Sequence, residues 1–293
     1  MLFSWYIVAY LFLAGAGSGA FLIAATCCMG DALRKTEASE RLVLAVQGGF
    51  YAAPCLVVLA GVFLLLDVGN VQRVWAVVAQ PFQSVLSVGA WLVALLAVLS
   101  GALAVAGLVL REVPRPLLWT CIAAGWFCAA GVMSYTGLLL SDMVSIDLWH
   151  TPWLVALFVA SSLSCGLAVV VGMDALVAPP SRTLPSGLWR AGVLFGCLEA
   201  LVLAVFVVVQ LGFTETAHAS CLLLLEGSLA PAFWGGVCLV GIALPLAAHG
   251  AGHLMPRRIA ALVSSAGVLV GGLFLRYCVV AAALYTPLAL AAI

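Results

Sequence analysis

The stretch from residue 84 to residue 110, SVLSVGAWLVALLAVLSGALAVAGLVL, decides the fold. It holds no charged residue, and it is longer than the roughly 20 apolar residues that an α-helix needs to cross a bilayer. Similar stretches recur along the chain, separated by charged or proline-containing segments. We therefore predict an all-α, polytopic integral membrane protein with eight transmembrane helices, at approximately 4–30, 42–67, 84–110, 117–141, 152–177, 188–211, 232–250 and 259–285.

The composition of the chain excludes several other classes of protein. Hydrophobic residues make up 66% of the 293 residues and charged residues only 8%, whereas soluble domains carry roughly a quarter of their residues as charged ones. Eight spans occupy residues 1–293 as a single membrane domain, embedded in membrane lipid, with no room for a soluble one. The 11 basic and 11 acidic residues cancel without forming a basic patch, so no nucleic acid partner is expected.

The basic residues orient the predicted bundle. Loops that keep Lys and Arg face the cytoplasm, and the loops after the first, third, fifth and seventh spans hold nearly all of them. The loops on the other side hold Arg73 alone, and Arg276 lies within the last span. Both termini are therefore predicted to face outward, to the periplasmic side. The loop residues counted as inner are Arg34, Lys35, Arg41, Arg111, Arg115, Arg182, Arg190, Arg257 and Arg258.

Two residue types inside the spans have structural explanations. Gly15, Gly17 and Gly19 lie in an apolar span with no strand before them, so they indicate close helix packing rather than a dinucleotide-binding loop. Most tryptophans fall near the predicted boundaries of the membrane, as interfacial anchors do. These are Trp5, Trp75, Trp149, Trp153 and Trp234 on the outer side and Trp119 and Trp189 on the inner side.

Ionisable side chains within the spans are costly and commonly mark a site or a pathway. With a helical rise of about 1.5 Å per residue, Glu199 lies roughly 16 Å from the inner surface, near the middle of the membrane. Tyr135 and Arg276 lie about 25 to 27 Å from that surface, and Tyr10 lies about 9 Å below the outer one. Asp67 is just above them, at the end of the second span.

Two interpretations of these groups are open. In the first, Arg276 extends to the outer headgroups, both tyrosines are interfacial, and Glu199 is a protonated core group. In the second, Tyr10, Tyr135, Asp67 and Arg276 bind a quinone through hydrogen bonds to its ring, while apolar walls hold its tail. Glu199 and Asp67 are then the candidates for proton transfer. The shared depth of three polar groups on three helices favours the quinone site.

The histidines do not have the spacing expected of a haem site. Bis-histidine haem b, the form to expect in a membrane anchor, requires two histidines that face each other at one depth. Here His150 and His218 lie in outer loops, and His249 and His253 lie at an inner helix end. We therefore predict no haem, and no metal site in this chain.

Five short motifs, in order from the first span to the last, resemble those of the NrfD / polysulfide reductase membrane-anchor family. The first span reads WYIVAYLFLAG from Trp5 to Gly15, and the fourth ends with YTGLLLS from Tyr135 to Ser141. The others are Asp67, Gly69, Arg73, Pro81, Ser84 and Gly89-Ala90-Trp91; Leu148-Trp149-His150 with Leu157 to Ser161; and Phe233-Trp234-Gly235, Gly241 and Pro245, followed by GGLFLRY from Gly271 to Tyr277.

The resemblance implies an eight-helix, haem-free subunit in a prokaryotic cytoplasmic (inner) membrane. Such a subunit exchanges electrons between menaquinone or another quinone and a ferredoxin-like iron-sulfur subunit on its outer face, which serves a molybdopterin catalytic subunit. Tyr10 and Tyr135 match positions associated with the quinone pocket. We place partner docking on the longer outer loops, 68–83, 142–150 and 212–231, with Arg73, Trp75, Trp149 and His150 as contact residues.

Two other functions stay open on the sequence. A secondary transporter or ion permease would use Glu199 and Arg276 as a coupling pair, although their estimated depths differ by about 10 Å. A purely structural anchor would have no quinone pocket. Reduction of a partner's clusters by added quinol distinguishes these three functions.

Overall fold

The protein's structure, a computed structural model, describes residues 4–34, 40–69, 84–109, 115–177, 186–250 and 256–284. This described part is all-helical, and eight helices in it are long and apolar enough to cross a membrane. The predicted fold class is confirmed. The spanning elements are α1 (Trp5–Arg34), α2 (Glu40–Val68), α4 (Val85–Val109), α5 (Arg115–Ser141), α6 (Pro152–Val177), α7 (Ser186–Leu211), η1 (Pro231–Ala243) continued by α9 (Leu244–Gly250), and α10 (Arg257–Ala281).

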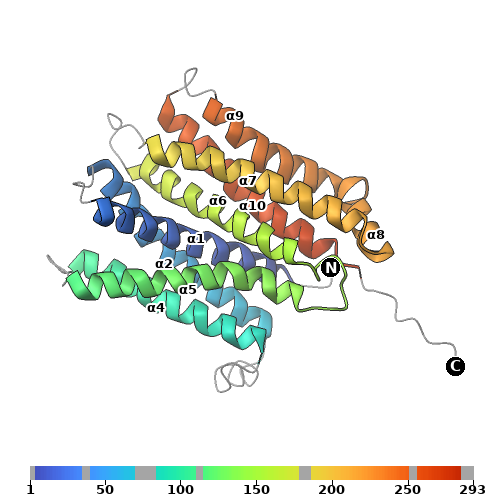
Figure 1. The fold of residues 1–293 in the computed structure, drawn as a ribbon, viewed down its shortest axis with the longest axis horizontal. Coiled ribbons are helices and arrows are strands. Elements are labelled where there is room, and N and C mark those ends of the chain that lie inside the picture. Colours follow the sequence, from blue (N-terminus) through green and yellow to red (C-terminus); the bar gives the residue numbers. More distant parts are fainter. Residues whose placement is uncertain are drawn as a thin grey trace.

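The spanning helices run roughly side by side, with α1 and α6 at the centre of the bundle (Figure 1). About 78% of the apolar window of α1 and of α6 is buried, against 22% in α4 and 17% in α7. One side of the bundle consists of α1, α2, α4 and α5, and the other of α6, α7, η1–α9 and α10. The exposed apolar faces of α4 and α7 are therefore the surfaces that suit contact with lipid tails.

Small residues hold the central helices close together. A Cβ atom added to Gly166 of α6 would overlap the carbonyl carbon of Gly19 in α1, so the two backbones touch. Gly271 of α10 packs in the same way against Gly241 of η1. Helix packing in membranes relies on such contacts because lipid tails remove the hydrophobic drive between helices. The interpretation of these glycines as packing residues is confirmed.

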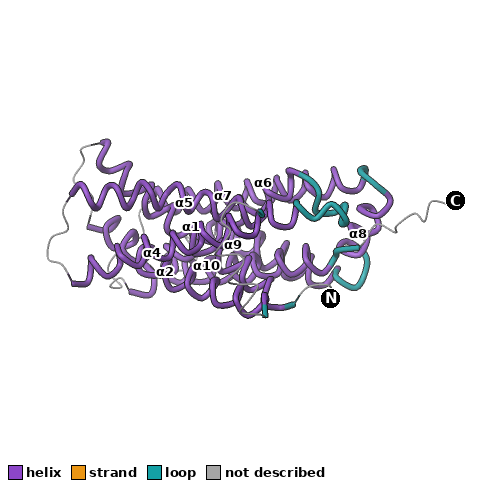
Figure 2. Tube along the Cα trace, turned by 90° about the horizontal axis from the view of Figure 1, so that it is seen from below, coloured by secondary structure: helices purple, strands orange, loops and turns teal. Residues whose placement is uncertain are grey.

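One end of the bundle carries both described ends of the chain and a short helix, α8 (Glu215–Leu225) (Figures 1 and 2). We call this the α8 end. Thr214 caps α8, since its side chain accepts a hydrogen bond from the Ala217 amide at 3.1 Å. The sequence analysis missed both this helix and the π-helical pitch of η1. Which side of the membrane the α8 end faces stays a prediction from the charge count.

Candidate functional site

The centre of the candidate site is a pair of buried tyrosines near the α8 end. Tyr10 of α1 is 0% exposed and Tyr135 of α5 is 3% exposed. The two side chains are close enough to interact electrostatically, and neither hydroxyl has a hydrogen-bond partner by strict geometry among the described residues. Buried hydroxyls nearly always make hydrogen bonds, and within the described residues these two have only each other, which leaves donor and acceptor capacity for a ligand. The structure thus brings together the two tyrosines that the sequence analysis selected.

A glycine makes room for this pair. The Tyr135 ring lies over Gly89 of α4, where an added Cβ atom would overlap the ring carbon Cζ. Any larger residue at position 89 would therefore move the ring and its hydroxyl. The sequence analysis quoted Gly89 as part of a motif but gave it no role, because only the packing of α4 against α5 shows it.

Asp67 is the last residue but one of α2, at the α8 end of the bundle. Its carboxylate accepts a hydrogen bond from the Ser4 hydroxyl. One turn earlier in α2, Phe63 packs against Tyr6 of α1, with ring centroids 6.3 Å apart, and Tyr6 is one turn before Tyr10 on the same face. Asp67 is therefore separated from the tyrosine pair by an aromatic layer, and it faces the end of the bundle.

Arg276 is fully buried where α1, α6 and α10 meet. Its guanidinium donates hydrogen bonds to the Leu11 carbonyl at 3.1 Å, the Gly272 carbonyl at 2.9 Å, the Ser161 hydroxyl at 3.0 Å and the Ser162 hydroxyl at 3.1 Å. The described hydrogen bonds of Arg276 thus go to backbone and serine oxygens and not to either tyrosine. The sequence placed Arg276 at the right depth. It could not show that Arg276 of α10 and Tyr10 of α1 meet different neighbours.

Two aromatic rings and a glycine accommodate the Arg276 guanidinium. Phe12 and Phe158 place their rings 5.8 and 5.5 Å from its central carbon, a separation that allows cation–π attraction. Gly15 leaves space for it, since an added Cβ would be 2.7 Å from a guanidinium nitrogen. Arg276 therefore does not extend to the headgroups, which excludes the snorkelling interpretation for this residue.

Glu199 of α7 is 5% exposed, and Ser161 and Ser164 of α6 interact with its carboxyl group. Ser161 also accepts the hydrogen bond from Arg276, so one serine contacts both ionisable side chains. The two side chains meet at one serine although their estimated depths differ, because long side chains reach along the bundle from their Cα positions. Ser161 was missed as a site residue; its only sequence signal is a serine pair within an apolar span.

The residues predicted to dock a partner have different outcomes. Arg73 and Trp75 lie outside the described residues. His150 is exposed, and its Nδ1 lies 3.0 Å from the Ser141 carbonyl. Trp149 is fully buried, and its indole N–H donates to the Val279 carbonyl at 2.9 Å. The expectation that Trp149 is an interfacial anchor with a surface for a partner is therefore wrong: the indole packs inward because the core at this end offers its N–H an acceptor.

The loop that carries Trp149 and His150 is fastened to the start of α8. The carboxylate of Asp147 accepts hydrogen bonds from the hydroxyls of Thr214, at 2.8 Å, and Thr216. The side-chain amide of Gln210 donates to the carbonyls of Asp147 and Leu148. Burial raises the pKa of the Cys221 thiol to about 11, so the buried face of α8 stays uncharged. The loop and α8 form one ordered cap, which we call the α8 cap.

Metal-binding side chains do not gather in the part of the chain that the structure describes. No group there of three or more His, Cys, Asp or Glu residues is arranged to hold an ion. His249 packs its ring on Trp189, with centroids 4.3 Å apart, and its Nδ1 lies 2.7 Å from the Pro245 carbonyl.

Comparison with known proteins agrees with this architecture. The family model described as "Polysulphide reductase, NrfD" matches residues 1–288. The sequence is also 30% identical, over 308 aligned positions, to a polysulfide reductase subunit of Wolinella succinogenes, covering 93% of this chain and 92% of that protein. With eight spans, it is a multi-pass protein of a prokaryotic cytoplasmic membrane. The protein belongs to the NrfD polysulphide reductase family of membrane subunits.

Proposed function

We propose that this chain is the quinone-exchanging membrane subunit of a respiratory molybdopterin oxidoreductase complex. Electrons pass between a quinone bound at Tyr10 and Tyr135 and an iron-sulfur subunit docked on the α8 cap. The observation that carries the proposal is the pair of buried tyrosine hydroxyls that interact with each other and have no hydrogen bond to any other described residue. Membership of the polysulphide reductase family supports it.

The residues around the pair fit a quinone headgroup. A tyrosine hydroxyl donates to a carbonyl and accepts from a hydroxyl, so one pair of tyrosines can bind both the oxidised and the reduced ring. When bound, the quinol would supply two electrons and two protons, and the quinone would take them up. Since the pair is closed in this structure, the ring gains access when the aromatic layer of Tyr6 and Phe63 opens toward the α8 end. Asp67, at that end, accepts or returns a proton at its carboxylate.

Arg276 has an indirect role in this proposal. Its hydrogen bond to the Leu11 carbonyl holds the turn of α1 next to Tyr10, and its bonds to Ser161 and Gly272 fix that turn against α6 and α10. Arg276 therefore contributes to quinone binding by positioning Tyr10. Its positive charge also favours the reduced, electron-rich form of a nearby ring.

The direct test is quinol-dependent reduction of the partner's iron-sulfur clusters in the intact, detergent-solubilised complex. Replacement of both tyrosines, Tyr10→Phe with Tyr135→Phe, should abolish fast reduction while the complex still assembles. Tyr51→Phe is the matched control, since Tyr51 of α2 lies beside Gly107 of α4, away from the pair. Reduction at the wild-type rate in the double variant would refute this site.

The transporter hypothesis receives less support. It requires Glu199 and Arg276 to couple an ion to a substrate and predicts helices broken at mid-membrane. The π-helix η1 instead continues directly into α9, and the hydrogen bonds of Arg276 are satisfied by backbone and serine oxygens. A subunit that works without partners would also bind its substrate after purification alone, which equilibrium binding can measure.

A further inference from the structure

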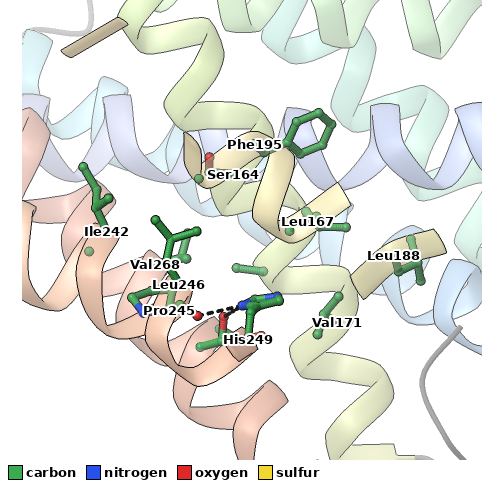
Figure 3. Close-up of a pocket in the computed structure, with 16 residues that line it drawn as sticks. Ser164, Leu167, Val171, Leu188, Phe195, Ile242, Pro245, Leu246, His249 and Val268 are labelled. Carbon is green, nitrogen blue, oxygen red and sulfur yellow. Dashed lines mark hydrogen bonds between the residues drawn. The ribbon is translucent and has the colours of Figure 1, made fainter. Parts of the chain in front are cut away.

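A second feature lies in the other half of the bundle, away from the tyrosine pair. A pocket with about 30 Å³ of space for water opens between α6, α7, the continuous η1–α9 helix and α10 (Figure 3). Most of its wall is apolar, formed by residues such as Leu167, Leu188 and Phe195. It lies toward the end of the bundle opposite α8, where α7 and α10 begin.

Four polar side chains face this apolar cavity. Ser164 and Ser265 are each 5% exposed. The Ser265 hydroxyl has no hydrogen-bond partner among the described residues, and the Ser164 hydroxyl interacts with the Glu199 carboxyl group. Ser264 lies 3.3 Å from Nδ1 of His249 (Figure 3). Buried hydroxyls of this kind commonly bond to internal water, provided that the space is roomy and several polar partners converge on it. A water molecule needs about 10 to 15 Å³ of such space, so this pocket has room for about two or three molecules.

His249 stands nearer the mouth with a defined orientation. Its Nδ1–H donates to the Pro245 carbonyl at 2.7 Å, which directs the other ring nitrogen, Nε2, toward Gly192 of α7. A Cβ added to Gly192 would lie 2.6 Å from this Nε2, so the glycine leaves space for the ring. Nε2 is thus the ring nitrogen left for a second hydrogen bond.

The far end of the cavity reaches Glu199. Ser164 lines the cavity and also interacts with the Glu199 carboxyl group. Phe195 and Gly196, in the cavity wall, precede Glu199 by one turn of α7 on the same face. The polar groups His249, Ser264, Ser265, Ser164 and Glu199 therefore form a series from the mouth to the middle of the bundle.

We propose that this cavity is a water-filled proton access route to Glu199 from the end of the bundle opposite α8. A proton that leaves the Glu199 carboxyl protonates water beside Ser164, and another leaves the water chain near His249, so the transfer is balanced without an oxidant or reductant. The route gives the proton-transfer role of Glu199 in the proposed function a direction, and in that respect it rests on that function. The hydration of the cavity does not depend on it.

The test is hydrogen–deuterium exchange at the Glu199 carboxyl, followed by infrared spectroscopy of the full-length chain in lipid nanodiscs after transfer to D₂O. Glu199→Gln identifies the carboxyl band. The double variant Ser164→Ala with Ser265→Ala should slow the exchange by about tenfold or more, because each lost hydroxyl removes a hydrogen bond that holds water. Ser100→Ala is the matched control, since Ser100 is a buried serine of α4 whose hydroxyl bonds to its own helix at Leu96.

Ser265→Ala alone is the second variant. Ser265 is not among the residues that interact with Glu199, so slower exchange of the Glu199 carboxyl in this variant reports on the cavity. Unchanged exchange in both serine variants would overturn the proposal. So would a wild-type carboxyl that does not exchange, the result expected if a lipid tail fills the cavity. Tyr135→Phe should leave the exchange unchanged. Wild-type exchange rates in the serine variants therefore refute the proton route, whereas a wild-type rate of quinol oxidation in Tyr135→Phe refutes the quinone site.

Discussion

At the scale of single residues, the hydroxyl of Tyr135 is the sharpest test of the quinone site. Tyr135→Phe removes one oxygen and almost no volume, and that oxygen has no strict hydrogen bond to the described protein, so folding and assembly should be preserved. The loss of one hydrogen bond to the reacting ring costs about 0.5 to 1.5 kcal/mol. We therefore expect quinol turnover to fall severalfold to about tenfold, measured as cluster reduction in the intact complex. An unchanged rate and quinol affinity would place the ring elsewhere.

Arg276 should behave differently because it fixes three helices rather than one ligand atom. Arg276→Gln removes the charge and most of the donors, and each hydrogen bond to a charged group contributes about 1.5 to 3 kcal/mol. The variant should lower both the melting temperature and turnover, by more than Tyr135→Phe does. Arg276→Lys keeps the charge without the planar fork, so an intermediate loss is expected. A melting temperature equal to that of the wild type in Arg276→Gln would contradict the positioning role.

Depth along a helix could be predicted at the residue scale, but contacts between helices could not. Counting residues from the span boundaries placed Tyr10, Tyr135 and Arg276 near the α8 end, where the structure also has them. The rotation of each helix about its axis decides which neighbours a side chain meets. It depends on packing that the nearly uniform apolar spans do not encode. For this reason Ser161 and Gly89 acquired roles only from the structure.

At the scale of elements, the contact between α4 and α5 sets the position of the Tyr135 ring. Gly89→Ala forces that ring to move, because the new Cβ would overlap it. We expect turnover to fall at least as far as in Tyr135→Phe, measured in the same assay. Gly101→Ala in the same helix meets no atom within 4 Å and should leave turnover unchanged while favouring the helix by roughly 0.5 to 1 kcal/mol. Equal turnover in the two variants would contradict the role of Gly89.

The α8 cap is the element that we expect the iron-sulfur partner to recognise. Asp147→Ala removes the acceptor for the Thr214 and Thr216 hydroxyls and should loosen the loop against α8. The expected result is weaker retention of the partner during purification, with the chain still inserted in the membrane. Asp147→Asn keeps an acceptor oxygen and should retain more of the partner. Full retention in Asp147→Ala would argue against docking on this cap.

The α8 cap also shows which helical elements could not be predicted from the sequence. A hydropathy pattern finds spans because each must bury about 20 apolar residues in lipid, and the boundaries followed to within a few residues. It does not report short helices such as α8, whose signal is a capping threonine followed by Glu215. Nor does it separate α from π pitch, so η1 was counted simply as part of a span.

At the scale of the whole molecule, the two halves place two polar systems on opposite sides of the α1–α6 contact. The tyrosine pair belongs to the half with α4 and α5, and the cavity that leads to Glu199 belongs to the half with α7, α9 and α10. Arg276 and Ser161 lie where the halves meet. Under the proposed function, electrons leave at the α8 end while protons move at the other end, so the sidedness of the bundle decides the direction of charge movement.

Sidedness is therefore the last prediction. The even number of spans puts both termini on one side, and the excess of Lys and Arg in the opposite loops predicts that the α8 end faces the periplasm. We expect Glu226→Cys, on the exposed turn after α8, to react with a membrane-impermeant thiol reagent added to intact cells. Lys35→Cys should react only after the membrane is opened. Both are made in a background without native cysteines that retains quinol turnover. Labelling of position 35 in intact cells would reverse the orientation and move the docking face to the cytoplasm.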